Sequence, residues 1–284
     1  MKLLVKIFII CLISFNFSLA RVIIVDINGS GNYRKITDGI NAAVAGDTVK
    51  VLPGVYEEQV ALSKDIVLMG SGCENTKIVY FTASPTVTIS NGKIMWFSIK
   101  NLSTGGVGVV FNGGTLTNCV VMYCTGNGVV LANGATGTIR NCVFLKNSGS
   151  GIYTQSSNSV VVYNCISAYN SNGFYNYYSY SNINVNYSCA YGNSGHNFAN
   201  TSGNVGNVTV NPQFVNINES ELDLRAPGVS DLGTPDFTDP DGTRSDMGYF
   251  GGPDAPVFPV VTSILFTPLP TGGIRIQAKA RANW

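Results

Sequence analysis

Residues Asn141–Tyr153 read NCVFLKNSGSGIY, and residues Asn164–Tyr175 read NCISAYNSNGFY, so the chain nearly repeats itself 23 residues later. Three columns of similar residues share this period, apart from one gap of 24 before Cys189. They are Cys119, Cys142, Cys165 and Cys189; Leu116, Ile139, Val162 and Val185; and Asn101, Cys124, Asn147, Asn170 and Asn193. A period of this length is typical of a stacked solenoid.

The repeat unit consists of short strands and tight turns. Polar and apolar residues alternate in stretches such as 182–187, NINVNY, which is the period of a strand. Glycine and asparagine interrupt the alternation every few residues, and no helical period persists within a repeat. Leucine-rich repeats are excluded because their leucine pattern is absent, and propeller blades need about 40 residues. The sequence therefore predicts an all-β parallel β-helix of about seven coils, a single-stranded solenoid with about 23 residues per coil.

In such a fold, equivalent residues of successive coils stack about 4.8 Å apart. We expect the column that includes Val162 to form an aliphatic ladder inside the tube. Asn118, Asn141 and Asn164 are expected at a turn, in left-handed backbone, with each amide bonding the copies above and below. Stacked cysteine side chains point the same way, which is poor disulfide geometry, so we expect buried free thiols.

The two ends of the chain differ from the repeats. Residues 1–20, MKLLVKIFIICLISFNFSLA, have the basic, apolar and small-residue order of a secretory signal peptide. We expect an N-terminal cap at 21–47, with a short helix that places Ile36, Ile40, Ala43 and Val44 on one face. The β-helix then covers 48–210, a C-terminal cap covers 211–255, and strands or a linker occupy 256–284.

Composition limits the partners. Only 12% of the residues are charged, the net charge is +1, and no basic tract suited to nucleic acid occurs. No second apolar stretch is long enough to cross a bilayer, so we expect no transmembrane segment after signal removal. We expect the mature protein to be a monomer that is secreted or held at the cell surface.

Residues 26–58, DINGSGNYRKITDGINAAVAGDTVKVLPGVYEE, resemble the opening of the pectate lyase-like (pectin lyase fold) superfamily of right-handed parallel β-helices. Residues 65–80, DIVLMGSGCENTKIVY, resemble its next coil. NPQFV at 211–215 and DPDGTRSDMGYFGGP at 239–253 are similar to the closing motif of bacterial secreted members. The resemblance covers about 26–253 and implies a right-handed β-helix. It does not imply one activity, because the superfamily includes lyases, hydrolases, esterases and non-catalytic surface proteins.

The resemblance implies that enzymes of this superfamily use aspartates on an outer face of the central coils. These aspartates are calcium ligands in some of the enzymes and catalytic groups in others. Glycoside hydrolysis needs two carboxylates, and calcium needs several carboxylate oxygens. In this chain no Asp or Glu occurs between Asn75 and Asn218. We therefore expect the central coils to lack the usual catalytic machinery, and the chain to need no cofactor.

Other groups remain as weaker candidates. Arg140 and Lys146 fall in one coil, where they are candidates for a proton-abstracting pair, and His196 is a candidate base. Asp239, Asp241 and Asp246 are weak candidates for calcium, although Asp and Gly also suit a tight turn. The aromatic residues Tyr175, Tyr177, Tyr178 and Tyr180 are the candidates for glycan binding, because flat rings beside amides suit sugars.

The sequence thus favours a secreted or cell-surface β-helix protein, without catalytic activity, that binds polysaccharide or serves as a scaffold. The alternatives are a polysaccharide lyase or glycoside hydrolase with a non-standard active site, and a purely structural stalk.

Overall fold

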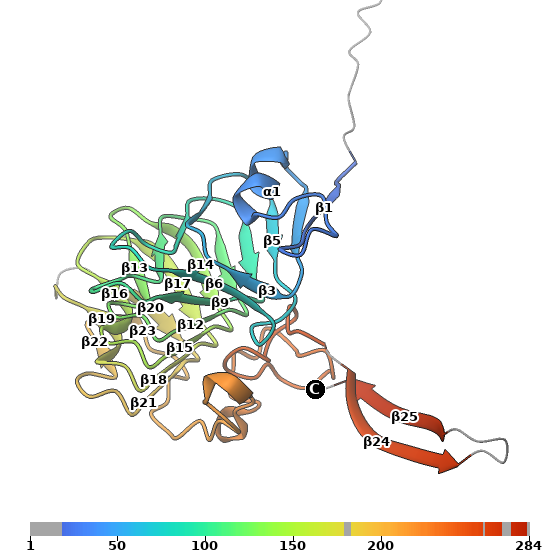
Figure 1. The fold of residues 1–284 in the computed structure, drawn as a ribbon. Helices are drawn as coiled ribbons and strands as arrows, with labels where there is room; N and C mark the ends of the chain where they lie inside the picture. The colour runs from blue at the N-terminus through green and yellow to red at the C-terminus, as the bar shows by residue number, and fades with distance from the viewer. Residues whose placement is uncertain (1–18, 179–182, 258, 269–273, 283–284) are drawn as a thin grey trace, which may run out of the picture.

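A computed structural model describes residues 19–178, 183–257, 259–268 and 274–282. Most of the predicted signal peptide, residues 1–18, and the candidate Tyr180 lie outside these ranges. The described chain winds into a tube of stacked coils, with the N-terminal coils and helix at one end and the last coils at the other (Figure 1). Among the described residues, no helix is both long and apolar enough to span a bilayer.

Each complete coil contributes one strand to each of three parallel sheets, which we call A, B and C. Within the described ranges, sheet A has nine strands and sheets B and C have seven each. Sheet A contains β1 (Val22–Val25), β2 (Thr48–Val51), β5 (Val67–Met69), β8 (Lys93–Met95), β11 (Thr115–Thr117), β14 (Thr136–Arg140), β17 (Ser159–Tyr163), β20 (Ile183–Asn186) and β23 (Thr201–Gly203).

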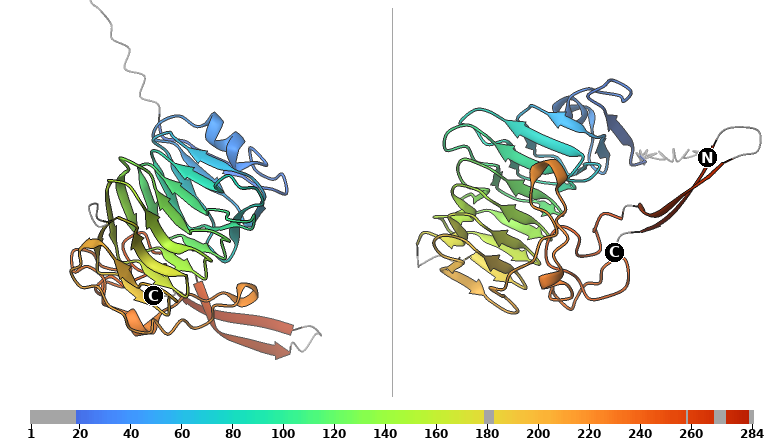
Figure 2. Two further views of the ribbon diagram at one scale, coloured as in Figure 1. Left: turned by 90° about the vertical axis from the view of Figure 1, so that its left-hand side faces the viewer. Right: turned by 60° about the horizontal axis from the view of Figure 1, so that its bottom comes forward.

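Sheet B contains β3 (Gly54–Tyr56), β6 (Thr76–Tyr80), β9 (Ser98–Asn101), β12 (Val120–Met122), β15 (Val143–Leu145), β18 (Ile166–Ala168) and β21 (Cys189–Tyr191). Sheet C contains β4 (Val60–Leu62), β7 (Val87–Ile89), β10 (Val109–Phe111), β13 (Val129–Leu131), β16 (Ser150–Thr154), β19 (Asn172–Asn176) and β22 (Phe198–Ala199). The stacked strands are visible side by side in Figure 2.

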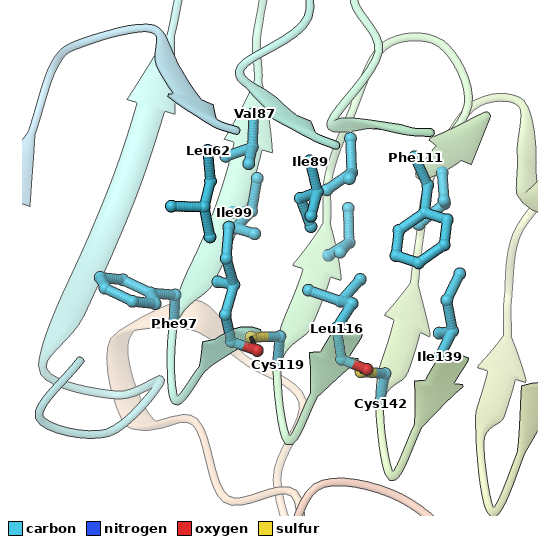
Figure 3. Close-up of a cluster of buried hydrophobic side chains, with 14 of the residues drawn as sticks. Leu62, Val87, Ile89, Phe97, Ile99, Phe111, Leu116, Cys119, Ile139 and Cys142 are labelled. Carbon is cyan, nitrogen blue, oxygen red and sulfur yellow. Dashed lines mark hydrogen bonds between the residues drawn. The ribbon is translucent and has the colours of Figure 1, made fainter. Parts of the chain in front are cut away.

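The predicted aliphatic ladder is confirmed. Leu116, Ile139, Val162 and Val185 are paired in register across sheet A and are fully buried. Figure 3 shows Leu116 beside Ile139, with Cys119 and Cys142 next to them in the same core. Alternation along each strand sends one residue into this core and the next outward, as expected for a pleated strand.

The cysteines are free and buried, as expected. The column itself needs one correction, because Cys189 does not continue it. Ser188 takes the next place, where its hydroxyl accepts a hydrogen bond from the Cys165 amide at 3.1 Å. Cys189 pairs with Ile166 and faces a second core outside the tube. The gap of 24 rather than 23 residues was the signal for this shift.

The N-terminal helix α1 (Ile36–Ala42) closes the first coil and buries Ile36 and Ile40. The prediction that Val44 shares this face was wrong, since Val44 is 48% exposed. The buried carboxylate of Asp47 accepts a hydrogen bond from the Val44 amide at 2.9 Å. The helix ends at Ala42, two residues before Val44, and this bond belongs to the extended chain that follows it.

The chain after β23 leaves the coils and returns along the outer face of sheet B. It contains the short 3-10 helices η1 (Glu219–Glu221) and η2 (Pro227–Val229). Residues 212–255, which we call the return segment, then reach the first coils, where the Tyr249 hydroxyl accepts a hydrogen bond from the Cys73 amide at 2.8 Å. The antiparallel hairpin of β24 (Pro259–Pro268) and β25 (Ile274–Ala282) follows and projects from the body (Figure 1).

The return segment covers the central part of the outer face of sheet B, so β9, β12, β15 and β18 are buried on both faces. A second core forms there from Val120, Met122, Val143, Leu145, Ile166, Ala168 and Cys189 of the coils and from Leu224, Val229, Met247 and Tyr249 of the return segment, with Cys73 beside them. The runs VVM at 120–122 and VFL at 143–145 lack the polar alternation of a half-buried strand. This continuous apolar pattern indicates that both faces of these strands are buried.

The asparagine ladder is at the predicted turn, but its bonding differs from the prediction. Asn118, Asn141 and Asn164 have φ of 44°, 47° and 53°, the left-handed conformation that asparagine tolerates. Their side-chain amides bond the return segment rather than one another: Asn118 donates to the Tyr249 carbonyl at 2.7 Å, and Asn141 donates to the Asp246 carbonyl at 3.1 Å.

Copy-to-copy bonding occurs instead in the column that contains Asn147, Asn170 and Asn193. Asn147 Nδ2 donates to Asn170 Oδ1 at 2.9 Å, and Asn170 Nδ2 donates to Asn193 Oδ1 at 3.2 Å. Asn147 Oδ1 also accepts from the Cys124 amide at 3.0 Å. These bonds pair polar groups that would otherwise be buried without partners.

Candidate functional site

The outer face of sheet C carries a row of aromatic rings at its distal end. Tyr153 on β16 and Tyr175 on β19 are paired in register, while their neighbours Ile152 and Phe174 point into the core. The ring centroids of Tyr153 and Tyr175 are 6.1 Å apart, with planes 17° apart. His196, from the turn before β22, stacks on the other side of Tyr175 at 5.9 Å.

Two further tyrosines follow β19 directly. The rings of Tyr177 and Tyr178 meet edge to face at 4.8 Å and are 55% and 38% exposed. The Tyr177 amide donates to the Thr154 carbonyl of the preceding coil at 2.9 Å, which holds this segment against the sheet. Three of the four predicted glycan-binding residues, Tyr175, Tyr177 and Tyr178, therefore lie together, and the fourth, Tyr180, is outside the described residues.

Sequence reasoning missed Tyr153 as a member of this group. The signal was present in the two repeated stretches, because NCVFLKNSGSGIY and NCISAYNSNGFY both end in tyrosine. Equivalent positions of a solenoid stack, so two tyrosines at the same place in successive coils form a row. We call Tyr153, Tyr175, Tyr177, Tyr178 and His196 the aromatic surface.

The three catalytic candidates do not come together. Arg140 lies on the outer face of sheet A, where it forms an ion pair with Asp254 and donates to the Tyr163 hydroxyl at 3.3 Å. Lys146 follows β15 of sheet B and donates to the Tyr123 hydroxyl at 3.4 Å. His196 belongs to the aromatic surface beside sheet C. The proposed pairing of Arg140 with Lys146 is therefore not observed as a contact.

Carboxylates do reach the acid-free coils, but they come from the return segment. Asp254 also forms an ion pair with Lys93 at 2.7 Å. Burial by itself raises the pKa of Asp254, but Lys93 and Arg140 outweigh this effect and hold the pKa below its ordinary value. Glu219 pairs in the same way with Lys77 and Lys100 of sheet B. The sequence showed no partner for these basic residues, because their partners lie more than 100 residues away in the chain.

The calcium candidates serve the fold of the return segment. Asp239 accepts a hydrogen bond from the Asp246 amide at 2.8 Å, and Asp246 accepts from the Asp231 amide at 2.7 Å. Asp241 accepts from the Thr243 amide at 2.9 Å. Within the described ranges, no three Asp, Glu, His or Cys side chains are grouped so that they would hold a metal ion.

Two cavities lie between the coils and the return segment. One, of about 440 Å³, is bordered by Tyr163 and Phe237, whose rings stack at 5.8 Å, and by Asp236. The other, of about 360 Å³, lies between sheet B and η1 and includes Glu74 and Ser98. Sequence reasoning found neither, because each is formed by residues far apart in the chain.

Residues 68–214, just over half of the chain, match the family model described as right handed beta helix region. The chain belongs to this right-handed β-helix family. The family assignment agrees with the expected fold and with the resemblance of the sequence to the pectin lyase-like superfamily. No curated protein matches the sequence.

Several solved structures are similar to this family member in fold. Pectin methylesterase from carrot is 15% identical, with a TM-score of 0.41, and the match covers 59% of this chain and 62% of the carrot chain. Pectin methylesterase from Erwinia chrysanthemi is 16% identical, with a TM-score of 0.38 and coverage of 60% and 65%. The Aspergillus niger enzyme is 13% identical, with a TM-score of 0.38 and coverage of 67% and 82%. The match thus spans less than two thirds of the carrot and Erwinia chains.

Proposed function

We propose that the protein is a secreted or cell-surface β-helix that binds polysaccharide without cleaving it, through the aromatic surface. One observation carries the proposal: aromatic side chains from successive coils stand in one row on an outer face, with Tyr177 more than half exposed. A repetitive row of rings matches a repetitive ligand, because neighbouring sugars of a chain can contact neighbouring coils.

The chemistry of the aromatic surface suits a sugar. Exposed rings offer an apolar face to the C–H side of a pyranose, and tyrosine hydroxyls form hydrogen bonds with its edge. The exposed residues Gln155 and Asn200 lie alongside: Gln155 accepts from the Tyr153 hydroxyl at 3.0 Å, and Asn200 Nδ2 donates to the Asn176 carbonyl at 3.0 Å. Amide groups of this kind supply further donors and acceptors for hydroxyls.

The coils that carry the aromatic surface lack the carboxylates that glycoside hydrolysis needs. Residues 76–218 contain no Asp or Glu, and the coils that carry the aromatic surface belong to this span. Glu219 and Asp254, which reach the coils from outside, form ion pairs beside sheets A and B. Glycoside hydrolysis requires two carboxylates at one bond, and nothing in these coils supplies them.

The double variant Tyr177→Ala/Tyr178→Ala tests the proposal. The protein or one of its variants is run in native gels that each contain one polysaccharide of a panel, and in parallel the chain length of each glycan after incubation with the protein is followed by size-exclusion chromatography. We expect wild-type protein to be retarded by at least one glycan, the double variant to lose about tenfold or more in affinity, and no glycan to shorten. Tyr33→Ala is the matched control, since Tyr33 is 37% exposed on the N-terminal cap.

Undiminished retardation of the double variant would contradict the assignment of the aromatic surface. Shortened glycan would contradict the non-catalytic function and favour a lyase or hydrolase. If no glycan retards the wild-type protein, the scaffold interpretation replaces binding.

We further propose that residues 1–20 direct export, and that 21–47, 48–210, 211–255 and 256–284 are the N-terminal cap, the β-helix, the C-terminal cap and a final strand region. Residues 1–20 have the basic, apolar and small-residue order of a signal peptide, which supports the first boundary. The change from coils to return segment supports the boundary near residue 211. Secretion is checked by N-terminal sequencing of protein recovered outside the cell.

A further inference from the structure

The smaller cavity between the coils and the return segment lies on a different sheet from the aromatic surface. Its floor is the outer face of sheet B, where Lys77 of β6 is paired in register with Ser98 of β9. Its wall is η1 and the residue that follows it. The cavity has a volume of about 360 Å³, within the range of small-ligand sites, and is lined by Glu74, Lys77, Ser98, Met122, Glu219 and Leu222.

Two buried polar atoms in this cavity have no hydrogen-bond partner among the described residues: Ser98 Oγ and Glu74 Oε2. Ser98 is only 1% exposed. Buried polar groups in folded proteins are nearly always paired, with protein, water or ligand. No other buried side-chain oxygen or nitrogen in the described ranges is left in this state. Both exceptions border the same cavity, which indicates that the cavity has an occupant.

The two lysines beside the cavity already have a carboxylate partner. Glu219 pairs with Lys100 and lies 3.8 Å from the Lys77 ammonium group. Lys100 also lies 5.3 Å from the ring centroid of Tyr123, so its charge is satisfied from two sides. An ionic ligand would have to break these pairs, whereas an uncharged ligand would leave them in place.

The unpartnered atoms specify the chemistry of the ligand. A serine hydroxyl donates or accepts, and a carboxyl oxygen accepts when ionised and donates when protonated. Burial raises the pKa of Glu74. A ligand hydroxyl matches either form because it too donates and accepts. Met122 and Leu222 add an apolar side to the cavity.

We propose that this cavity binds one uncharged sugar residue, with hydroxyls on Ser98 and Glu74 and its apolar face toward Met122. The site is separate from the aromatic surface and does not depend on its function. Its volume accommodates a single ring, which is either a free sugar or the end of a glycan chain.

Ser98→Ala tests this proposal through two readouts with different expected directions. Removing an unpartnered hydroxyl leaves the melting temperature of the free protein unchanged or higher. The matched control is Ser167→Ala: Ser167 is also a buried strand serine, but its hydroxyl accepts from Asn170 Nδ2 at 3.1 Å. We expect the control variant to melt at a lower temperature. A lower melting temperature for Ser98→Ala would overturn the proposal, because the hydroxyl would then have a structural partner.

Binding is measured by saturation-transfer NMR of the full chain with methyl glycosides of glucose, galactose, mannose and xylose. Oligosaccharides that end in the same sugars form a second arm and stand for a chain end. We expect transfer to at least one probe, an affinity loss of about tenfold or more in Ser98→Ala and Glu74→Gln, and no loss in Ser167→Ala. Transfer to a glycoside alone identifies a free-sugar site, and transfer to oligosaccharides alone identifies a chain end.

The double variant Tyr177→Ala/Tyr178→Ala separates the two sites. We expect it to keep glycoside binding in the cavity even where it loses polysaccharide at the aromatic surface. The cavity proposal is overturned if no probe binds the wild-type protein, which would mean that ordered water alone occupies the cavity. It is also overturned if Ser98→Ala binds as tightly as wild type.

Discussion

At the residue scale, the direction of a side chain decides its role, because neighbours in a strand face opposite sides of the sheet. Val162 is fully buried in the aliphatic ladder, whereas Val161, one residue earlier, faces outward beside Tyr163. The two valines have the same chemistry and almost the same position in the chain. Their environments differ completely, so they make a matched pair for testing the register.

Val162→Asp introduces a carboxylate into the tube with no cation to pair with it. We expect this substitution to lower the free energy of unfolding by more than about 4 kcal/mol. A loss of that size prevents soluble production of many domains of ordinary stability. Val161→Asp should be produced in soluble form and melt within a few degrees of wild type. Soluble yield and thermal melting of both variants check this; equal behaviour of the two would show that the register is wrong.

Asp246 is a second residue whose environment determines its effect. Burial, together with the nearby charges of Asp239, Asp231 and Asp241, raises the pKa of Asp246 to about 6. The folded state therefore holds this proton at pH values where the unfolded chain, with an ordinary pKa near 3.8, has released it. Stability is favoured below about pH 4 and falls as the pH rises toward 6.

Asp246→Asn removes this titration and keeps the oxygen that accepts from the Asp231 amide. We expect the variant to be more stable than wild type at pH 7, by about 1–2 kcal/mol after allowing for solvent screening, and no more stable below pH 4. Urea unfolding at a series of pH values measures the difference. Asp65→Asn, a change at an exposed residue outside the return segment, is the control, and a gain at pH 7 that equals the gain at pH 4 would contradict the explanation.

At the element scale, the turn between sheets A and B joins the repeat to the non-repeating return segment. Asn164 is fully buried there and makes two hydrogen bonds to the return segment. Its Nδ2 donates to the Ser245 hydroxyl at 3.0 Å, and its Oδ1 accepts from the Thr234 amide at 2.7 Å. Its left-handed backbone, with φ of 53°, is costly for most residues but not for glycine. Two substitutions therefore separate the backbone from the hydrogen bonds.

Asn164→Gly keeps the backbone conformation and loses both hydrogen bonds, and we expect it to lower the free energy of unfolding by about 1–3 kcal/mol. Asn164→Ala loses the same bonds and adds the strain of left-handed backbone, about 1 kcal/mol more. Chemical denaturation of the two variants measures both contributions. Equal stability of Asn164→Ala and wild type would mean that the turn does not hold the return segment.

The same turn shows how far the sequence alone can predict this protein. The period of 23 residues relates each residue to its copies, so it correctly gave the ladder through Val162, the left-handed asparagines and the buried thiols. It carries no information about contacts between the repeats and a segment that does not repeat. For that reason the partners of Asn164, Arg140 and Glu219 could not be predicted, and neither could the cavities that these contacts enclose.

At the scale of the whole molecule, the return segment converts an array of coils into one body. Each coil touches only its neighbours, as in other solenoids, and such arrays unfold piecewise when nothing spans them. Here Asp254 contacts strands β8 and β14, and Trp96 Nε1 donates to the Asp254 carbonyl at 2.9 Å. The first and later coils are thus linked through a segment that lies far from both in the chain.

A chain that ends at Val210 lacks the return segment and exposes the apolar outer face of sheet B. We expect it to aggregate or to bind a hydrophobic dye, since a contiguous apolar face of this kind is not stable in water. A chain that ends at Val257 lacks only the hairpin and should remain soluble with a wild-type melting temperature. Dye fluorescence and light scattering compare the two, and a soluble, dye-free chain ending at Val210 would refute the role of the return segment.

The path of the return segment also has a mechanical consequence. A simple solenoid that is pulled from its last coil can unravel one coil at a time, each step at low force. In this protein the chain reaches its final hairpin only after passing back to the bonds at Cys73 and Lys93 in the early coils. Tension on the C-terminal end therefore pulls first on the return segment along sheet B, and the last coils are shielded from load until that segment has peeled away.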